Sequence, residues 1–138
     1  MPAGNGSPCR TRVKRRVDVR IDLPALSTNK LFQGRKHRSY HYKVFRKKVF
    51  TILREELRET YKLNGNLRLC MTVGFSSKLS DLSNSIKAIE DILCEYLGFD
   101  DRQIVHIELY KYIVPKGEEY MDITISKTRK NIDMRKRK

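Results

Sequence analysis

Apolar residues that alternate with polar ones mark four candidate strands along the chain. Residues 17–23, VDVRIDL, alternate with a period of two, which is typical of a strand with one buried face. Residues 67–75, 104–114 and 120–126 have strand-forming compositions and predict three more strands. The tripeptide Pro115-Lys116-Gly117 predicts that the last two strands form a hairpin.

A helical period replaces this alternation in two segments. The first helix is predicted from about Tyr40, and the Asn-Gly-Asn at residues 64–66 is expected to end it. The second is predicted from Ser80, as its N-cap, to about Leu97, with Gly98 as its C-terminal stop. The apolar faces comprise Phe45, Val49, Ile52, Leu53 and Leu57 in the first helix and Leu82, Ile86, Ile89, Leu93 and Leu97 in the second.

The resulting order, β-α-β-α-β-β, predicts a single α+β domain in which two helices pack on a mixed four-stranded sheet. At 138 residues the chain is long enough for one such core. We place this domain at residues 17–126. It lies between a basic N-terminal arm, residues 1–16, and a basic C-terminal tail, residues 127–138, and we expect both ends to be flexible.

Positive charge is concentrated in these two ends. The chain has a net charge of +14, and residues 1–16 contain five basic and no acidic residues. Residues 127–138 contain seven basic residues against Asp133. Such arms add sequence-independent affinity for phosphate through counterion release. The alternative is a pair of disordered tails that only keep the chain in solution.

Several classes of protein are disfavoured by the composition. No stretch approaches the roughly 18–20 apolar residues that cross a membrane. The N-terminus lacks the apolar core of a signal peptide, so we expect a cytoplasmic protein without membrane partners. The cysteines are Cys9, Cys70 and Cys94, an odd number without C-x-x-C spacing, which argues against a disulfide scaffold or a zinc site. We expect Cys70 and Cys94 to be small buried residues.

Acidic residues flank the second predicted helix, and a lysine lies on it. Magnesium prefers hard oxygen ligands and keeps several waters, so one or two carboxylates and a substrate phosphate can complete its site. A lysine beside such a site stabilises the negative charge of the phosphate. The alternative is a cap residue, a surface ion pair and turn formers with no catalytic role. The residues concerned are Asp81, Asn84, Lys87, Asp91 and the pair Asp100–Asp101.

A second basic segment supports a nucleic-acid partner. Residues 35–48 contain seven Lys or Arg and no acidic residue, with aromatic residues between them. Such a surface can follow a phosphate backbone and stack against bases. Phe45 is expected in the core because of its helical spacing. The candidate DNA-binding residues are Arg35, Lys36, Arg38, Lys43, Arg46, Lys47 and Asn84.

The motif D-L-S-N-x-x-K-x-x-x-D, from Asp81 to Asp91, is followed by G-F-D-D-x-Q-I-V. This combination resembles the RusA family of Holliday junction resolvases. The earlier LPALSTNK is similar to that family's Leu-Pro…Ser-Asn-Asn opening, and the later Val-Pro-Lys-Gly also fits. The resemblance runs from about residue 17 to residue 126, and its most specific part is residues 81–105.

The resemblance implies a small, homodimeric, magnesium-dependent endonuclease that nicks opposed strands of a four-way DNA junction. Carried over by position, Asp81, Lys87 and Asp101 are the catalytic residues, and Asp81 and Asp101 are also metal ligands with Asp91 as a weaker one. We therefore predict a crossover junction endodeoxyribonuclease of DNA recombination and repair. Its cofactor would be Mg2+, with Mn2+ as a substitute and no small-molecule cofactor. It would act in the cytoplasm of a bacterial or phage-infected host cell.

One position departs from the family's pattern. Ser83 stands where the family usually has its second aspartate, so the site has one fewer negative charge and a weaker ligand. A natural variant that binds the ion with a replacement such as Asp91, a loss of activity, or an alteration made to trap substrate would each explain it. The alternative function is therefore a branched-DNA-binding protein of the same fold with weakened or no catalysis. A small basic RNA-binding protein is a more distant alternative, which predicts that Asp81 and Asp101 are dispensable.

Overall fold

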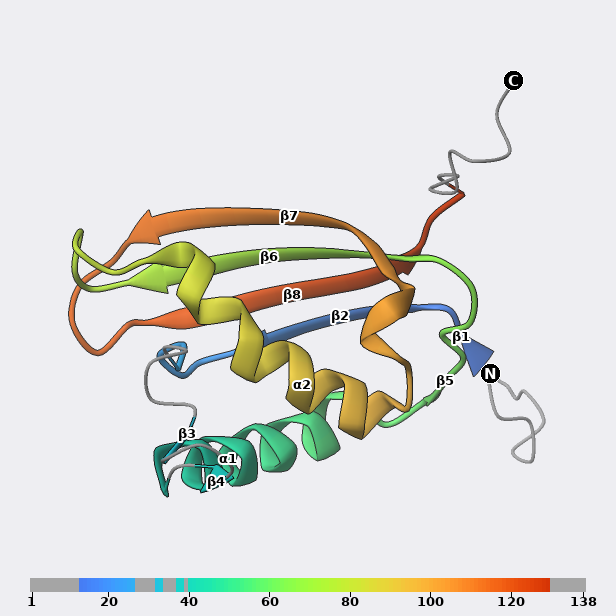
Figure 1. Cartoon of the computed structure of the whole chain (residues 1–138), viewed down its shortest axis with the longest axis horizontal. Coiled ribbons are helices and arrows are strands. Elements are labelled where there is room, and N and C mark those ends of the chain that lie inside the picture. The colour runs from blue at the N-terminus through green and yellow to red at the C-terminus, as the bar shows by residue number, and fades with distance from the viewer. Residues whose placement is uncertain (1–12, 27–31, 34–36, 39, 130–138) are drawn as a thin grey trace, which may run out of the picture.

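The computed structural model describes residues 13–26, 32–33, 37–38 and 40–129. These residues form one α+β domain in which two α-helices pack against a mixed four-stranded sheet, as the sequence predicts (Figure 1). The sheet consists of β2 (Arg16–Ile21), β6 (Leu67–Phe75), β7 (Ile104–Ile113) and β8 (Tyr120–Lys127), and the helices are α1 (Tyr40–Glu56) and α2 (Ile86–Leu97). The shorter elements are β1 (Val13–Lys14), β3 (Phe32–Gln33), β4 (His37–Arg38), β5 (Thr60–Tyr61) and the 3-10 turns η2 (Leu82–Ser85) and η3 (Asp101–Gln103).

One face of the sheet carries the hydrophobic core. The period-two alternation of β2, β6 and β8 turns every second side chain to this face, and α1 and α2 both lie on it (Figure 1). The helices contribute Tyr42, Phe45, Val49, Leu53, Ala88, Ile89, Ile92 and Leu93, all buried. Phe45 is only 7% exposed, which confirms its prediction as a core residue.

The opposite face of the sheet is polar. The strand register places Arg16, Asp18, Arg20, Arg68, Thr72, Asp122 and Thr124 on this face. Several of these side chains pair across it: Arg16 Nε lies 2.9 Å from Asp18, and the Thr124 hydroxyl donates to Asp18 at 2.8 Å. Opposite charges therefore neutralise one another locally on this face.

The prediction that the last two strands form a hairpin is wrong. The sheet order is β2-β8-β6-β7, so β6 lies between β7 and β8. β6 runs parallel to β7 and antiparallel to β8, and α2 forms the crossover between the two parallel strands. The chain then passes the end of β6, where Val114 N–H donates to the Phe75 carbonyl at 2.8 Å. A Pro-Lys-Gly sequence turns the chain, but β6 lies between β7 and β8, so the two strands on either side of this turn do not pair.

Several predicted boundaries also differ. α1 ends at Glu56, well before residues 64–66, because β5 follows and pairs with β1 in parallel. Residues 13–16, assigned to the N-terminal arm, therefore belong to the folded domain, and Lys14 contacts Glu59 at 2.8 Å. At the other end, Lys127 of the predicted tail belongs to β8, and Thr128 N–H donates to the Asn66 carbonyl at 2.9 Å. Residues 1–12 and 130–138 of the two predicted basic ends lie outside the described residues.

The two helices are held together by a mixed polar and aromatic contact. Arg46 of α1 binds the Glu95 carboxylate of α2 with two guanidinium nitrogens and stacks over Phe50, 4.2 Å from its ring centre. Phe50 in turn meets Tyr96 edge to face at 5.1 Å. Across the described residues, neither helix has the length and apolar character required to cross a membrane.

Candidate metal and nucleic-acid site

Asp81 lies after the loop that follows β6, directly before the η2 turn. Its backbone is extended, at φ −100° and ψ 113°, and its side chain caps η2 by accepting from Ser83 N–H at 3.1 Å. The Ser83 hydroxyl donates to the same oxygen at 2.8 Å, and the Asn84 amide donates to the other oxygen at 3.0 Å. The helical segment therefore starts at Asp81 and not at Ser80 as predicted, because the aspartate satisfies the exposed N–H groups of the first turn.

The loop before Asp81 is fixed from the neighbouring strand. The Lys111 ammonium of β7 donates to the carbonyl oxygens of Lys78, at 2.9 Å, and Ser80, at 2.5 Å. Within the turn itself, the Ser85 hydroxyl donates to the Leu82 carbonyl at 2.6 Å, and Ser85 is only 2% exposed. The position of the Asp81 carboxylate is thus set by both the sheet and the helix.

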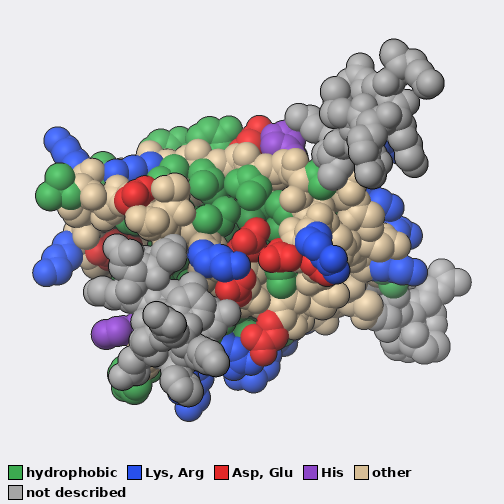
Figure 2. All heavy atoms as spheres, in the orientation of Figure 1, with side chains coloured by type: hydrophobic (Ala, Val, Ile, Leu, Met, Phe, Trp, Pro, Cys, Tyr) green, Lys and Arg blue, Asp and Glu red, His purple; other side chains and the backbone are tan. Residues whose placement is uncertain are grey.

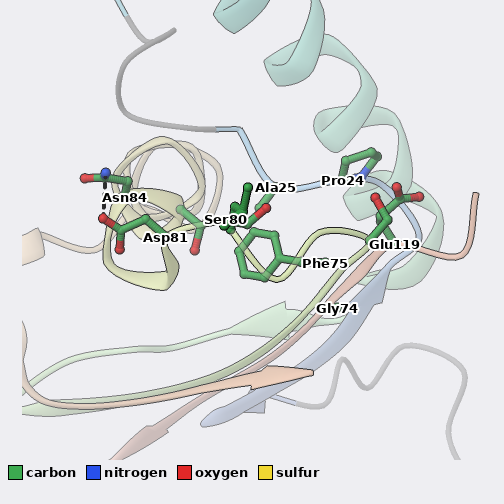
Figure 3. Close-up of a pocket in the computed structure, with 11 residues that line it drawn as sticks. Pro24, Ala25, Gly74, Phe75, Ser80, Asp81, Asn84 and Glu119 are labelled. Atoms are coloured by element: carbon green, nitrogen blue, oxygen red, sulfur yellow. Dashed lines mark hydrogen bonds between the residues drawn. The ribbon is translucent and has the colours of Figure 1, made fainter. Parts of the chain in front are cut away.

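A cavity of about 380 Å3 opens beside this turn, at the carboxyl end of β6. Figure 3 shows Asp81 and Asn84 at one end of the cavity, Glu119 at the other, and Phe75 between them. The pKa of Glu119 is lowered, first by a hydrogen bond from its own N–H and then by the Ser76 hydroxyl. Two carboxylates therefore line opposite ends of one cavity of mixed polar and apolar lining, which has room for a hydrated cation and a phosphate oxygen.

A second acidic group lies along the outer side of α2. Lys87 and Asp91 form an i,i+4 ion pair of 3.1 Å, and this contact with Asp91 is the first cause of the raised Lys87 pKa. Glu90 and Asp101 raise it further. Burial is the first cause of the raised Glu90 pKa. Acidic and basic side chains are seen together over the middle of this face (Figure 2). We call Lys87, Glu90, Asp91 and Asp101 the Lys87 cluster.

Cys94 adjoins the Lys87 cluster. Burial raises the pKa of its thiol to about 12, and Glu90 and Asp101 contribute to the shift. The thiol is therefore protonated at neutral pH and is a poor metal ligand and nucleophile. Both Cys70 and Cys94 are half-buried, so neither reaches the full burial that the sequence predicted.

Asp100 closes the loop after α2. Gly98, in the left-handed conformation at φ 79°, ends the helix as predicted. Asp100 then caps η3, and Gln103 completes a capping box by accepting from Asp100 N–H at 2.8 Å. Arg102 contacts Asp100 at 2.9 Å and is the first cause of the lowered Asp100 pKa. Gln103 also donates to the carbonyls of Leu63 and Gly65, which ties this loop to the start of β6.

The predicted metal ligands are thus distributed between two places. Asp81, Ser83 and Asn84 form the η2 turn, whereas Asp91 and Asp101 belong to the Lys87 cluster with the predicted catalytic lysine. The twelve residues of α2 lie between the turns that carry Asp81 and Asp101, a rise of about 18 Å. Within the part of the chain that the structure describes, no three His, Cys, Asp or Glu side chains are grouped to hold a metal ion.

The predicted DNA-binding residues also differ in their surroundings. Lys43 and Lys47 are exposed on α1, and Tyr40 at its start is 72% exposed. Arg46 is bound to Glu95, as described above. Arg38 lies in β4, while Arg35 and Lys36 lie outside the described residues.

Three site residues were not found from the sequence. Glu119 and Lys111 reach the Asp81 region only through the strand order, and no local pattern indicates that they do. Glu90 follows Lys87 by three residues on a predicted helix, so helical spacing does carry a signal for its position.

Comparisons with known proteins give no family for this site. No protein-family model matches the chain, and no curated protein matches it.

Proposed function

We propose that the chain is a magnesium-dependent DNA endonuclease that resolves four-way junctions as a homodimer in the cytoplasm. The single observation that carries the proposal is the Asp81 carboxylate, held by its capping turn at the rim of a cavity at the end of β6. The motif shared with the RusA family and the net charge of +14 also support it.

The residues at the cavity fit a hard divalent cation. Asp81 offers carboxylate oxygens, and a carboxylate accepts about four hydrogen bonds or metal bonds, of which three are used within the turn. Glu119 supplies a second carboxylate at the opposite end of the same cavity, with Phe75 between the two. Magnesium needs only one or two carboxylates because it keeps several waters. When bound, it would lower the pKa of a coordinated water and neutralise phosphate charge.

Lys87 and Asp101 have a different role in this proposal. The Lys87 ammonium is paired with Asp91, and we propose that it also contacts a phosphate lying along α2. Asp101 is exposed in the Lys87 cluster, and we propose that it binds a second cation there when DNA is bound. Dimerisation follows from the task, because two opposed nicks in a two-fold junction need two sites related by two-fold symmetry.

The test is cleavage of a synthetic four-way junction with Mg2+, Mn2+ or chelator. We expect cleavage that needs the metal and falls at least ~100-fold in Asp81→Asn and in Asp101→Asn. Asp18→Asn is the matched control, because Asp18 is exposed and pairs with Arg16 on the polar face of the sheet, opposite the helices. Cleavage that survives both substitutions would remove the site assignment. Cleavage lost equally in Asp18→Asn would show a loss of folding instead.

A second candidate, junction binding without cutting, is favoured by one contact. The Ser83 hydroxyl donates to Asp81. Residue 83, which corresponds to the second aspartate of the RusA family, therefore supports the capping turn and offers no second carboxylate. This second candidate predicts that the wild-type chain binds junction DNA with or without magnesium and leaves it intact. Ser83→Asp would restore the second carboxylate, and cleavage gained by that variant alone would favour this candidate over the first.

A further inference from the structure

β7 is an open edge of the sheet. It stands last in the order β2-β8-β6-β7, so one side of a ten-residue strand has no partner among the described strands. The bond from Val114 N–H to Phe75 shows which residues face β6, because N–H and C=O groups alternate in direction along a strand. The groups that point to the open edge therefore belong to Ile107, Leu109, Lys111 and Ile113.

Exposed hydrophobic side chains gather on this strand. Of the seven large hydrophobic residues exposed in the described chain, four lie in β7: Ile107 at 46%, Tyr110 at 48%, Tyr112 at 57% and Ile113 at 47%. They occupy both faces, since the register puts the isoleucines on the helix side and the tyrosines on the polar side. Figure 2 shows hydrophobic side chains along the border that β7 forms in Figure 1.

The usual protection of an edge strand is missing here. Natural edges are guarded by proline, by bulges or by exposed lysines that discourage pairing. β7 contains no proline, and its pairing with β6 is regular from His106 to Ile113. Its one lysine, Lys111, directs its ammonium to the carbonyls of Lys78 and Ser80 and so does not guard the edge.

We propose that β7 pairs in antiparallel fashion with β7 of a second copy of this chain, about a two-fold axis through Tyr110. In that register Ile107 faces Ile113 of the other copy on the helix side, and Tyr110 faces its own counterpart on the polar side. The two sheets become one continuous sheet of eight strands. The pairing is self-complementary, as a two-fold interface requires.

Neighbouring registers are less favourable. Moving the axis to Leu109 sets Ile107 opposite Lys111 and Ile113 opposite Val105, next to the irregularity in the β6–β7 pairing, and moving it to Lys111 places two lysines directly opposite each other. The register centred on Tyr110 pairs Ile107 with Ile113, Leu109 with Lys111 and Tyr112 with Glu108, and it brings the four exposed hydrophobic residues into the interface. This inference deepens the homodimer part of the proposed function and rests on it only there, because it requires no catalysis.

The experiment compares two variants with equal numbers of substitutions. In Ile107→Lys/Ile113→Lys the proposed register sets lysines opposite lysines, whereas in Ile107→Lys/Ile113→Glu it sets lysines opposite glutamates. Mass is measured by sedimentation or light scattering over a range of concentrations, against 16.3 kDa for one chain. We expect a wild-type dimer, a dimer for Lys/Glu, and a dissociation constant at least ~10-fold higher for Lys/Lys. Circular dichroism checks that each variant is folded.

Other outcomes overturn the pairing. A monomeric wild type, or two charge variants with the same dimer affinity, would exclude this register. A dimer lost in Thr72→Arg, at the centre of the polar face, but kept in Lys/Lys would place the interface on that face instead. A monomer that still cuts junctions would overturn the pairing and leave the nuclease. A dimer that depends on residues 107 and 113 but cuts no junction would support the pairing and overturn the nuclease proposal.

Discussion

The two short turns that flank α2 are built in the same way. Asp81 caps η2 and Asp100 caps η3, both from an extended backbone. Each side chain accepts a hydrogen bond from the N–H two residues later, at Ser83 and Arg102 respectively. Both aspartates therefore meet the ordinary need of a helical start for an acceptor.

What differs is the side chain two residues after the cap. Ser83 adds a hydroxyl to Asp81, which is neutral, so the carboxylate keeps its full negative charge at the cavity. Arg102 adds a guanidinium to Asp100, which cancels that charge and lowers the Asp100 pKa. The same local motif thus gives one carboxylate available to an external cation and one already bound to an internal cation.

The largest effect is expected from giving Asp81 the surroundings of Asp100. Ser83→Arg places a guanidinium at the spacing that Arg102 has from Asp100. It should pair with Asp81, oppose a metal ion there and reduce magnesium-dependent junction cleavage at least ~100-fold. Ser83→Gln is the matched control, because it is long and polar but uncharged, and it should retain most of the activity. Equal loss in both variants would mean that the size of residue 83, and not its charge, controls the site.

A smaller effect is expected from loosening the second turn. Gln103→Ala removes the acceptor for Asp100 N–H and both donations to the Leu63 and Gly65 carbonyls, which should lower the free energy of unfolding by about 1–2 kcal/mol. Gln103→Glu keeps the acceptor and removes the donor, so it separates the two contributions. Urea denaturation measures both. A stability unchanged in Gln103→Ala would show that the loop is held by other contacts.

The helices and strands can be predicted from the sequence because the side that each buries sets a pattern among residues that are close in the sequence. Alternation in residues 17–23 and helical spacing from Tyr40 both indicate which side faces the core, and both elements are found, the strand as Arg16–Ile21. The partner of each strand is a long-range property. The Pro115 turn is compatible with a hairpin or a crossing, and only the central place of β6 excludes the hairpin.

In the candidate site, too, local contacts could be predicted from the sequence and long-range contacts could not. Asp81 as an early-turn aspartate and Lys87 paired with Asp91 are local patterns, and the structure contains both contacts. Whether Asp101 shares a cation with Asp81 depends on how α2 and its loops are arranged in space, and the structure places the two carboxylates in turns at opposite ends of α2. Glu119 enters the cavity through a loop that is distant in sequence, so no spacing rule could have indicated it.

The smallest effect concerns the acid stability of the second turn in metal-free buffer. Arg102 holds the Asp100 pKa below its ordinary value of 3.8, so this contact stabilises the fold above the unfolded pKa and is lost as pH falls through the folded pKa. Because the pair is exposed, the contribution is small and is screened by salt. Arg102→Gln should therefore lower the melting temperature slightly near neutral pH, and the difference from wild type should shrink below about pH 4. Asp100→Asn, which cannot titrate, should show the same convergence. A difference that stays constant down to about pH 2, or grows on acidification, would show that Arg102 acts through something other than the Asp100 charge.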